Sequence, residues 1–249
     1  MLPLSRLRGY CDQLLRIDEF DDYCPNGLQV ESGEQVQRLA TGVTASQALI
    51  DAAAEWGADA LLVHHGYFWK GEGPCIRGLK GRRIASLIRQ EISLLAYHLP
   101  LDSHPELGNN RQLADRLGIR EPTPAGETGL LWKGRLAESL TGQGLAFLLE
   151  ERLEREPLHL PGGPQPIRSL AWCTGAAQGY IEQAAALGLD AYISGEVSEA
   201  TFHTAVERNI HYFAAGHHAT ERYGVQALGE AASKALGLEH RYFDIPNPV

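Results

Sequence analysis

Histidine and carboxylate side chains recur at three places in the sequence, each time just after an apolar run that predicts a buried strand. They are the adjacent pair His64 and His65, the pair His98 and Asp102, and the pair His217 and Glu221. Imidazole nitrogens and carboxylate oxygens are the ligands that many divalent metal ions bind. Because ligands gather outside the carboxyl ends of parallel strands, we expect these side chains to form a metal site.

The adjacent imidazoles favour a site with two ions. Successive side chains of a strand point to opposite faces, so His64 and His65 are expected to diverge and to serve different ions. The whole ligand set is also too large for a single ion that keeps positions open to water. It comprises His64, His65, Asp102, His217 and Glu221. We expect Glu221 to bridge the ions, and His98 or His218 to transfer protons.

Other groups carry weaker signals. Single histidines are usually structural, hydrogen-bonded residues, and this is the expectation for His104, His159, His203, His211 and His240. For His218 the sequence leaves two alternatives: a role beside the ligands or the substrate, or a solvent-exposed position. The glycine-rich segment 71–78 lacks a phosphate-loop pattern and predicts only a loop. The aromatic run 67–69 fits a base-stacking surface, a core or a subunit contact.

The elements that would position these residues alternate between strands and helices. Apolar runs predict strands at 36–43, 60–63 and 92–97, and helical spacing predicts helices at 45–57 and 84–91. This βαβαβ order is typical of a mostly parallel sheet with helices packed on it.

An internal repeat extends the pattern along the chain. Shifted by 131 positions, residues 39–62 match residues 170–193 at ten of 24 positions, including Asp59 with Asp190. Alanine-rich composition could produce part of this match, but the ungapped register favours a duplicated unit. The predicted fold is therefore α/β, with two similar α/β halves and a dinuclear metal site between them.

We expect the halves at residues 1–122 and 167–249, joined at 123–166 by a connector with one strand and one helix. The four cysteines lie far apart in the sequence and predict free thiols. The formal charge of −9 and the pI near 5.6 argue against a nucleic-acid or anionic-membrane surface. No apolar segment reaches the ~20 residues that span a bilayer, so we expect a cytoplasmic protein.

Six segments follow one another along nearly the whole chain: YCPNGLQVE (23–31), GVTAS (42–46), VHHGYFWKGE (63–72), HLPLDSHPELGNN (98–110), ISGEVSE (193–199) and AGHHATER (215–222). Together they resemble the YbgI-like branch of the NGG-interacting-factor-like (NIF-three-like) family, whose members are often labelled GTP cyclohydrolase I type 2 homologues. The resemblance implies a two-lobed α/β fold in subunits that assemble as a toroidal homohexamer. It also implies that the five ligands named above hold two metal ions, with His98 as a further ligand or a group behind the ligands.

These observations lead to the hypothesis of a dinuclear metal-dependent hydrolase, GTP cyclohydrolase I type 2-like, that acts on a nucleotide-like or other small heterocyclic substrate. Two divalent ions, drawn from Zn, Fe, Mn and Ni, would lower the pKa of a bound water and polarise the bond under attack. The alternative is a metal-binding or metal-delivery assembly protein without turnover. An enzyme needs open coordination positions, whereas a carrier can close the shell around its metal.

Overall fold

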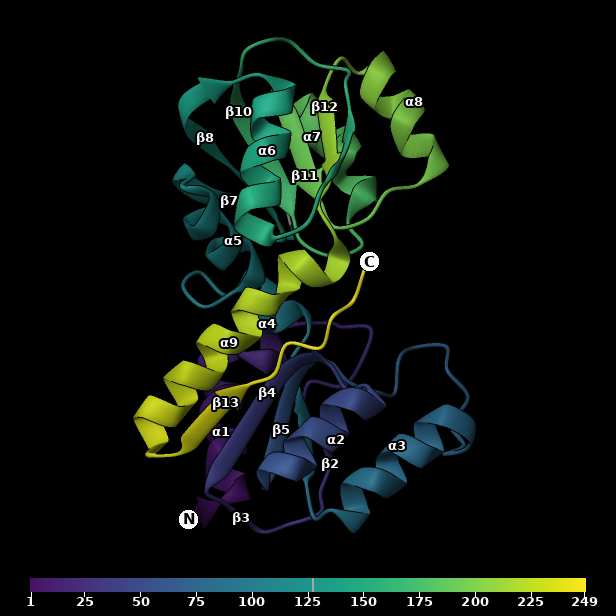
Figure 1. Cartoon of the computed structure of the whole chain (residues 1–249), viewed down its shortest axis with the longest axis vertical. Coiled ribbons are helices and arrows are strands. Elements are labelled where there is room, and N and C mark those ends of the chain that lie inside the picture. Colours follow the sequence, from purple (N-terminus) through teal and green to yellow (C-terminus); the bar gives the residue numbers. More distant parts are fainter. Residues whose placement is uncertain (127) are drawn as a thin grey trace. The chain divides into compact units, whose positions relative to one another are not determined.

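The computed structural model describes residues 1–126 and 128–249. Within them the chain forms two compact units (Figure 1), the first of residues 1–108 and 224–246 and the second of residues 109–223 and 247–249. This grouping differs from the predicted segments. The physical reason is that the chain returns to the first unit near its end, where β13 (Glu239–Tyr242) pairs with β4 (Arg38–Thr44).

The first unit is built on a mostly parallel sheet. In spatial order its strands are β13, β4, β5 (Ala60–His65), β6 (Ser93–Ala96) and β2 (Gly27–Val30). All are parallel to their neighbours except β2, which runs antiparallel beside β6. The strands β4, β5 and β6 are almost entirely buried, as parallel strands with apolar residues on both faces are expected to be. A separate antiparallel ladder joins β1 (Leu2–Pro3) to β3 (Gln35–Val36).

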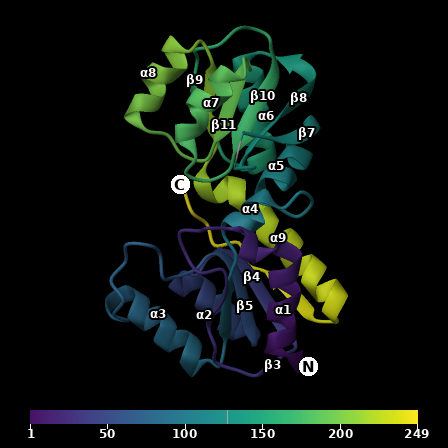
Figure 2. The ribbon, with the colours of Figure 1, turned by 180° about the vertical axis from the view of Figure 1, so that it is seen from behind.

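Helices cover both faces of this sheet (Figure 2). On one face, α1 (Leu4–Leu15) and the C-terminal part of α9 (His217–Leu236) share an apolar cluster with alternate residues of β5. On the other face, α2 (Gln47–Trp56) and α3 (Gly78–Arg89) share a cluster with the intervening residues of β5. Two apolar layers therefore hold the strand whose end carries the adjacent histidines.

The second unit is built on a mixed sheet. In spatial order its strands are β7 (Arg120–Ala125), β8 (Leu131–Leu140), β10 (Ile167–Cys173), β11 (Ala191–Ser194), β12 (His211–Ala214) and β9 (Leu158–Leu160). The strands β10, β11 and β12 are parallel, and the outer strands join antiparallel. The strand and the helix predicted for the connector are present, but β8 pairs with β10, so this segment is part of the second unit itself.

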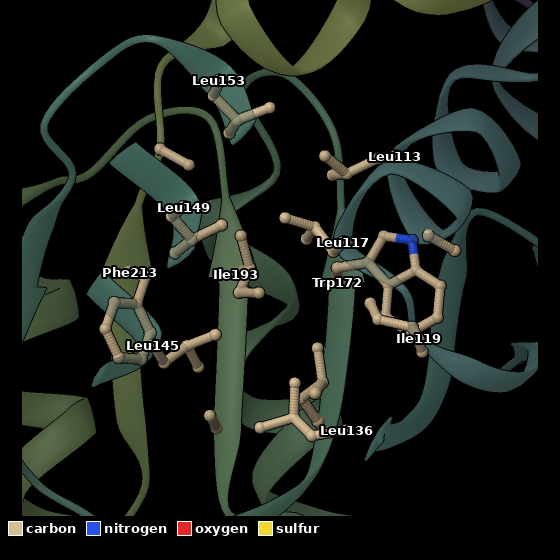
Figure 3. Packing of buried hydrophobic residues seen from close by; sticks show 14 of the residues in the cluster. Leu113, Leu117, Ile119, Leu136, Leu145, Leu149, Leu153, Trp172, Ile193 and Phe213 are labelled. Atoms are coloured by element: carbon tan, nitrogen blue, oxygen red, sulfur yellow. The ribbon is translucent and has the colours of Figure 1, made fainter. Parts of the chain in front are cut away.

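The helices of this unit are α5 (Asn109–Leu117), α6 (Gly142–Leu153), α7 (Ile181–Ala186), α8 (Glu199–Glu207) and the start of α9. Short 3-10 helices lie at Gln178–Tyr180 here and at Ile17–Glu19 in the first unit. Figure 3 shows Leu117 of α5, Leu149 of α6 and Ile193 of β11 in one apolar cluster. A second cluster packs α7 and α8 on the other face of the sheet.

The two sheets share a local pattern at the repeated segments. Residue 39 of β4 lies opposite residue 60 of β5, and residue 170 of β10 lies opposite residue 191 of β11, so the register is unchanged by the shift of 131. The carboxylates of Asp59 and Asp190 each accept two backbone N–H groups at the start of the preceding strand. These contacts agree with the alignment, and the duplication itself stays a prediction.

The predicted α/β class is confirmed. The expected strands correspond to β4, β5 and β6, and the helix expected at 84–91 begins earlier, at Gly78. The four cysteines are free thiols, as predicted. No helix within residues 1–126 and 128–249 combines the length and apolar character needed to cross a bilayer.

Candidate metal centre

His64 is a fully buried residue near the end of β5, with 0% of its surface exposed. Its Nδ1 atom lies 2.9 Å from the backbone carbonyl oxygen of Tyr97. Because a carbonyl can only accept, the Nδ1–H of His64 donates to it, and the Nε2 atom of the neutral ring keeps its lone pair. Nε2 lies 3.5 Å from Oδ1 of Asp102. The Tyr97 carbonyl thus selects the tautomer in which Nε2 can bind a metal ion.

His65 is half-buried and is the last residue of β5. Its Nδ1 atom lies 3.2 Å from the hydroxyl of Thr44, which is the residue opposite it in β4. The ring centroids of His64 and His65 are 4.5 Å apart, with the planes tilted by 46°. The rings therefore stay closer than the predicted divergence, because strict alternation applies inside a strand and His65 stands at its end.

His98 follows β6 and precedes α4 (Leu99–Ser103). Its Nδ1 atom lies 2.7 Å from Oδ1 of Asp22. The other oxygen of Asp22 accepts from the Leu99 N–H and from the amide of Asn26, each at 2.9 Å. Burial opposes ionisation of Asp22, but these hydrogen bonds and the His98 contact outweigh it and lower its pKa to about 2. An ionised carboxylate therefore holds the His98 ring.

The three imidazoles of the first unit form a group that could bind a metal ion. One ligand nitrogen from each of His64, His65 and His98 lies within 4.8 Å of the others. Trp69 packs against this group, with its ring centroid 5.0 Å from that of His98 and 6.0 Å from that of His65. Of the predicted aromatic run, Trp69 therefore lies beside the candidate site, whereas Tyr67 lies in the core.

Asp102 lies on α4 with its side chain 9% exposed. Its backbone N–H donates to the carbonyl of His98 in the first turn of the helix, at 3.1 Å. The carboxylate, however, approaches His64, which comes from a different strand. The first unit thus brings together four of the residues proposed from the sequence: His64, His65, His98 and Asp102.

In the second unit, His217 is the first residue of α9. Its Nδ1 atom lies 2.7 Å from Oε1 of Glu196, and its Nε2 atom lies 3.0 Å from Oε2 of Glu221, one helical turn along. Burial disfavours the charged ring, but the hydrogen bonds and charges of Glu221 and Glu196 outweigh it and raise the pKa of His217 to about 9. At neutral pH the metal-free side chain is an imidazolium, and a metal ion would displace its proton.

Glu221 is buried, with 3% of its surface exposed. Gly175 makes room for it: this residue has φ +70°, and a Cβ atom there would overlap Oε1 of Glu221. The Gly175 N–H donates to the hydroxyl of Thr220 at 3.1 Å, which holds the loop against α9. Only glycine meets both the left-handed backbone and the close approach of the carboxylate.

The three histidines of the first unit and His217 of the second unit share one feature. Each presents its Nδ1 atom to a protein oxygen, and the partners are Tyr97, Thr44, Asp22 and Glu196. Metal-binding histidines commonly have such an oxygen behind the ring, because it fixes the ring's orientation and leaves Nε2 for the metal. The donor set of imidazoles and carboxylates suits Zn, Fe, Mn or Ni.

The other histidines are distributed as follows. His218 is 8% exposed, which excludes the solvent-exposed alternative, and its backbone N–H donates to the carbonyl of Val249. The histidines that were expected to be structural each have a hydrogen-bond contact outside the proposed ligand set, namely His104, His159, His203, His211 and His240.

The carboxylates that contact the rings of His98 and His217, Asp22 and Glu196, were not among the predicted site residues. Asp22 stands 76 residues before His98, so no local spacing could reveal the pair. Its position directly before the family-like segment 23–31 was the available signal. For Glu196 the available signal was the internal repeat, because Glu196 matches the predicted ligand His65 after the shift of 131. Cys24 lies within 4.8 Å of Asp22 and His98, but burial and the charge of Asp22 raise the pKa of its thiol to about 12.

The model of the family described as Duf34/NIF3 (NGG1p interacting factor 3) matches residues 3–248. The chain belongs to this family. A GTP cyclohydrolase 1 type 2 homolog of Pseudomonas aeruginosa is 56% identical over 251 residues, which cover 100% of this chain and 99% of that protein. The protein of the same name from Escherichia coli (strain K12) is 51% identical over 98% of this chain and 99% of its own.

Two solved structures share the fold of this chain over its whole length. The structure of protein ybgI, of unknown function, is 49% identical and covers 100% of both chains with a TM-score of 0.97. A crystal structure of a Thermus thermophilus protein is 34% identical, again over 100% of both chains, with a TM-score of 0.90. The resemblance carried by the six sequence segments is therefore confirmed at the level of the family.

Proposed function

We propose that this Duf34/NIF3 protein is a dinuclear metal-dependent hydrolase that acts on a nucleotide-like or other small heterocyclic substrate. The observation that carries the proposal is the oxygen partner behind each of four histidine rings, at 2.7 to 3.2 Å from Nδ1. Structural histidines need no common orientation, whereas metal ligands do. The name of the relatives, GTP cyclohydrolase 1 type 2 homolog, supports the class of reaction.

The proposed ligands are His64, His65, Asp102, His217 and Glu221, which together would hold two divalent ions. When bound, such ions act as Lewis acids and lower the pKa of a water molecule toward neutrality. Glu221 is the proposed bridging carboxylate, since it is buried and fixed by Gly175 and by its contact with His217. Asp102 takes the corresponding place beside His64 in the first unit.

Two further histidines are proposed to move protons. His98 has its Nδ1 atom on the ionised carboxylate of Asp22, which orients the ring and leaves Nε2 as the atom that would exchange a proton. This is the arrangement that a general base requires. His218 is the second proposed group, because it is buried directly beside the ligand His217.

The test combines elemental analysis with a turnover screen of nucleotides that includes GTP and oxidised bases. We expect His65→Ala to lose bound metal and turnover together. The matched control is His203→Ala, which removes an exposed histidine that pairs with Glu199. Turnover that persists in metal-depleted protein would refute the hydrolase proposal. Metal binding without turnover on the whole panel would favour the metal-delivery alternative.

A second experiment asks whether the ligands of the two units act on the same ions. Asp102→Ala and Glu221→Ala are each expected to remove most of the bound metal, and the double variant is expected to lose little more. Ligands that served independent ions would instead give additive losses, because distant and uncoupled substitutions add. Metal stoichiometry at equal free-metal concentration distinguishes these outcomes.

We also propose a homohexamer with a small-molecule substrate, as the family resemblance implies. Sedimentation velocity is expected to give a particle of about six times the 27.2 kDa chain mass. A monomer or dimer at micromolar concentration would overturn the assembly without affecting the metal proposal.

A further inference from the structure

The chain carries a concentration of positive charge that the metal centre does not use. Residues 70–89 contain six lysine and arginine side chains and one carboxylate, Glu72, whereas the whole chain has a formal charge of −9. Glu72 is already engaged, since it accepts from Lys80 at 2.9 Å. The remaining cations in this segment give this part of the surface a local positive potential.

Three of these cations line one open hollow of the first unit. The hollow has a volume of about 590 Å³, and Arg77, Arg82 and Arg89 line it together with Ser86 and Gln47. This volume lies within the range of about 300–1,000 Å³ that small-molecule sites occupy. Three like charges around one hollow repel one another unless an anion neutralises them.

Within the described part of the chain, the guanidinium groups of Arg77, Arg82 and Arg89 make no ion pair or hydrogen bond, although other exposed arginines do. Arg111 and Arg208, for example, each pair with a carboxylate on a nearby turn or helix. The arginines of the hollow therefore keep their planar donor faces for a ligand. Guanidinium groups bind phosphate oxygens through paired N–H donors.

One end of the hollow lies at the carboxyl edge of the sheet. Gln47 is the first residue of α2, which follows β4, and Gly78 begins α3, which follows β5 by way of the loop 66–77. Helices that follow parallel strands begin at the carboxyl edge of the sheet, and His65 ends β5 at this same edge. Gly78 and Gly81, which also line the hollow, leave the face of the first turn of α3 that borders it without side chains.

From these observations we infer that the arginine hollow between α2 and α3 binds the phosphate group of a small phosphorylated molecule. Arg77 and Arg82, near the start of α3, are the proposed phosphate contacts, and Arg89, two helical turns beyond Arg82, adds positive charge to the hollow. The Ser86 hydroxyl accepts from the Gln47 amide at 3.1 Å and offers its O–H as a further donor. Ile76, which is 57% exposed, gives an apolar wall for the rest of the molecule. The assignment of this molecule as the substrate rests on the proposed hydrolase function, whereas phosphate binding does not.

The test uses full-length protein that has been stripped of metal by a chelator, so that phosphate cannot bind through an ion. Inorganic phosphate and pyrophosphate are titrated by calorimetry at low ionic strength, with sodium chloride as the blank. Arg82→Gln and Arg77→Gln are each expected to weaken binding by about tenfold to a hundredfold, as the loss of a charge-assisted hydrogen bond predicts. Arg82→Lys should keep part of the affinity, because it keeps the charge but not the paired donors.

Arg6→Gln is the matched control, since it removes an exposed arginine from α1 in the same unit. Equal affinity in all variants, or no saturable binding by the wild-type protein, would overturn the inference. It would also fall if the arginine variants changed the sedimentation coefficient and left phosphate affinity intact, because the surface would then be a contact between copies. Turnover is not measured here, so failure of the hydrolase proposal gives a separate result.

Discussion

The raised pKa of His217 makes a quantitative prediction about how metal affinity depends on pH. In the metal-free protein this ring lies 2.7 Å from Glu196 and 3.0 Å from Glu221, and its pKa is raised to about 9. A metal ion bound at His217 must displace the proton that the ring holds. Protons and metal therefore compete for one nitrogen, and affinity rises with pH until the ring loses its proton unaided.

The expected magnitude follows from this competition. Below pH 9, one displaced proton lowers metal affinity by about tenfold per pH unit, which corresponds to about 1.4 kcal/mol. Between pH 8 and pH 7, His217 alone should thus account for a tenfold change and the release of about one proton per ion bound. Glu196→Gln removes one of the two carboxylates that raise the pKa, so this slope should become shallower and the affinity should fall by about 10- to 100-fold.

Calorimetry with Zn²⁺ or Mn²⁺ in buffers of different ionisation enthalpy measures both the affinity and the number of protons released. The matched control is Glu199→Gln, which removes another histidine-paired carboxylate of the second unit, the partner of His203. The reasoning would be refuted by an affinity that stays constant from pH 7 to pH 8, or by proton release that Glu196→Gln leaves unchanged.

Two further predictions concern stability and the glycine at the site. Gly175→Ala should lower the free energy of unfolding by about 2–5 kcal/mol and remove most of the bound metal, because its Cβ would overlap Glu221. The control is Gly188→Ala, at φ +67° with open space around it, which should lower the free energy of unfolding by about 1–2 kcal/mol and keep the metal. Urea unfolding and elemental analysis measure both effects. Burial lowers the pKa values of His159 and His211, so at these two sites the unfolded chain binds more protons than the folded chain near and below pH 6.5, and they destabilise the metal-free protein as the pH falls through that window. The raised pKa of His217 acts in the opposite direction between pH 9 and pH 6.5, so the test compares variants. On going from pH 7.5 to pH 5.5 in urea titrations, His159→Gln, which cannot be protonated, should lose less free energy of unfolding than the wild type, and an equal pH dependence of the two proteins would contradict the assignment.

The strands and the positions of the metal-binding candidates were predictable because their signal is local. Continuous apolar runs identified β5 and β6, since a parallel strand buried on both faces favours apolar residues at every position. The polar residues that end such runs were then conspicuous. His64 was predicted in this way from the four apolar residues before it, and the structure buries it fully at the end of β5.

The return of the chain to the first unit was not predictable in the same way. The segment around β13 reads as a strand in isolation, but its partner β4 lies about 200 residues earlier, and only the pairing assigns it to that sheet. The oxygen partners of the histidines could not be predicted for the same reason. Asp22 and Glu196 acquire their roles from contacts across 76 and 21 residues, which no helical or strand periodicity encodes.

Equal spacing in the sequence also leads to unequal chemistry in the two ligand pairs. His217 begins α9, so Glu221 on the next turn of the same helix contacts it directly at 3.0 Å. His98 precedes α4 with φ −101° and ψ −105°, outside the helical region, and its ring turns to Asp22 instead. Asp102 then lies against His64, which leaves His98 oriented by a carboxylate of its own. The same four-residue interval therefore supplies a ligand pair in the second unit, but in the first unit it separates a ligand from the proposed proton carrier.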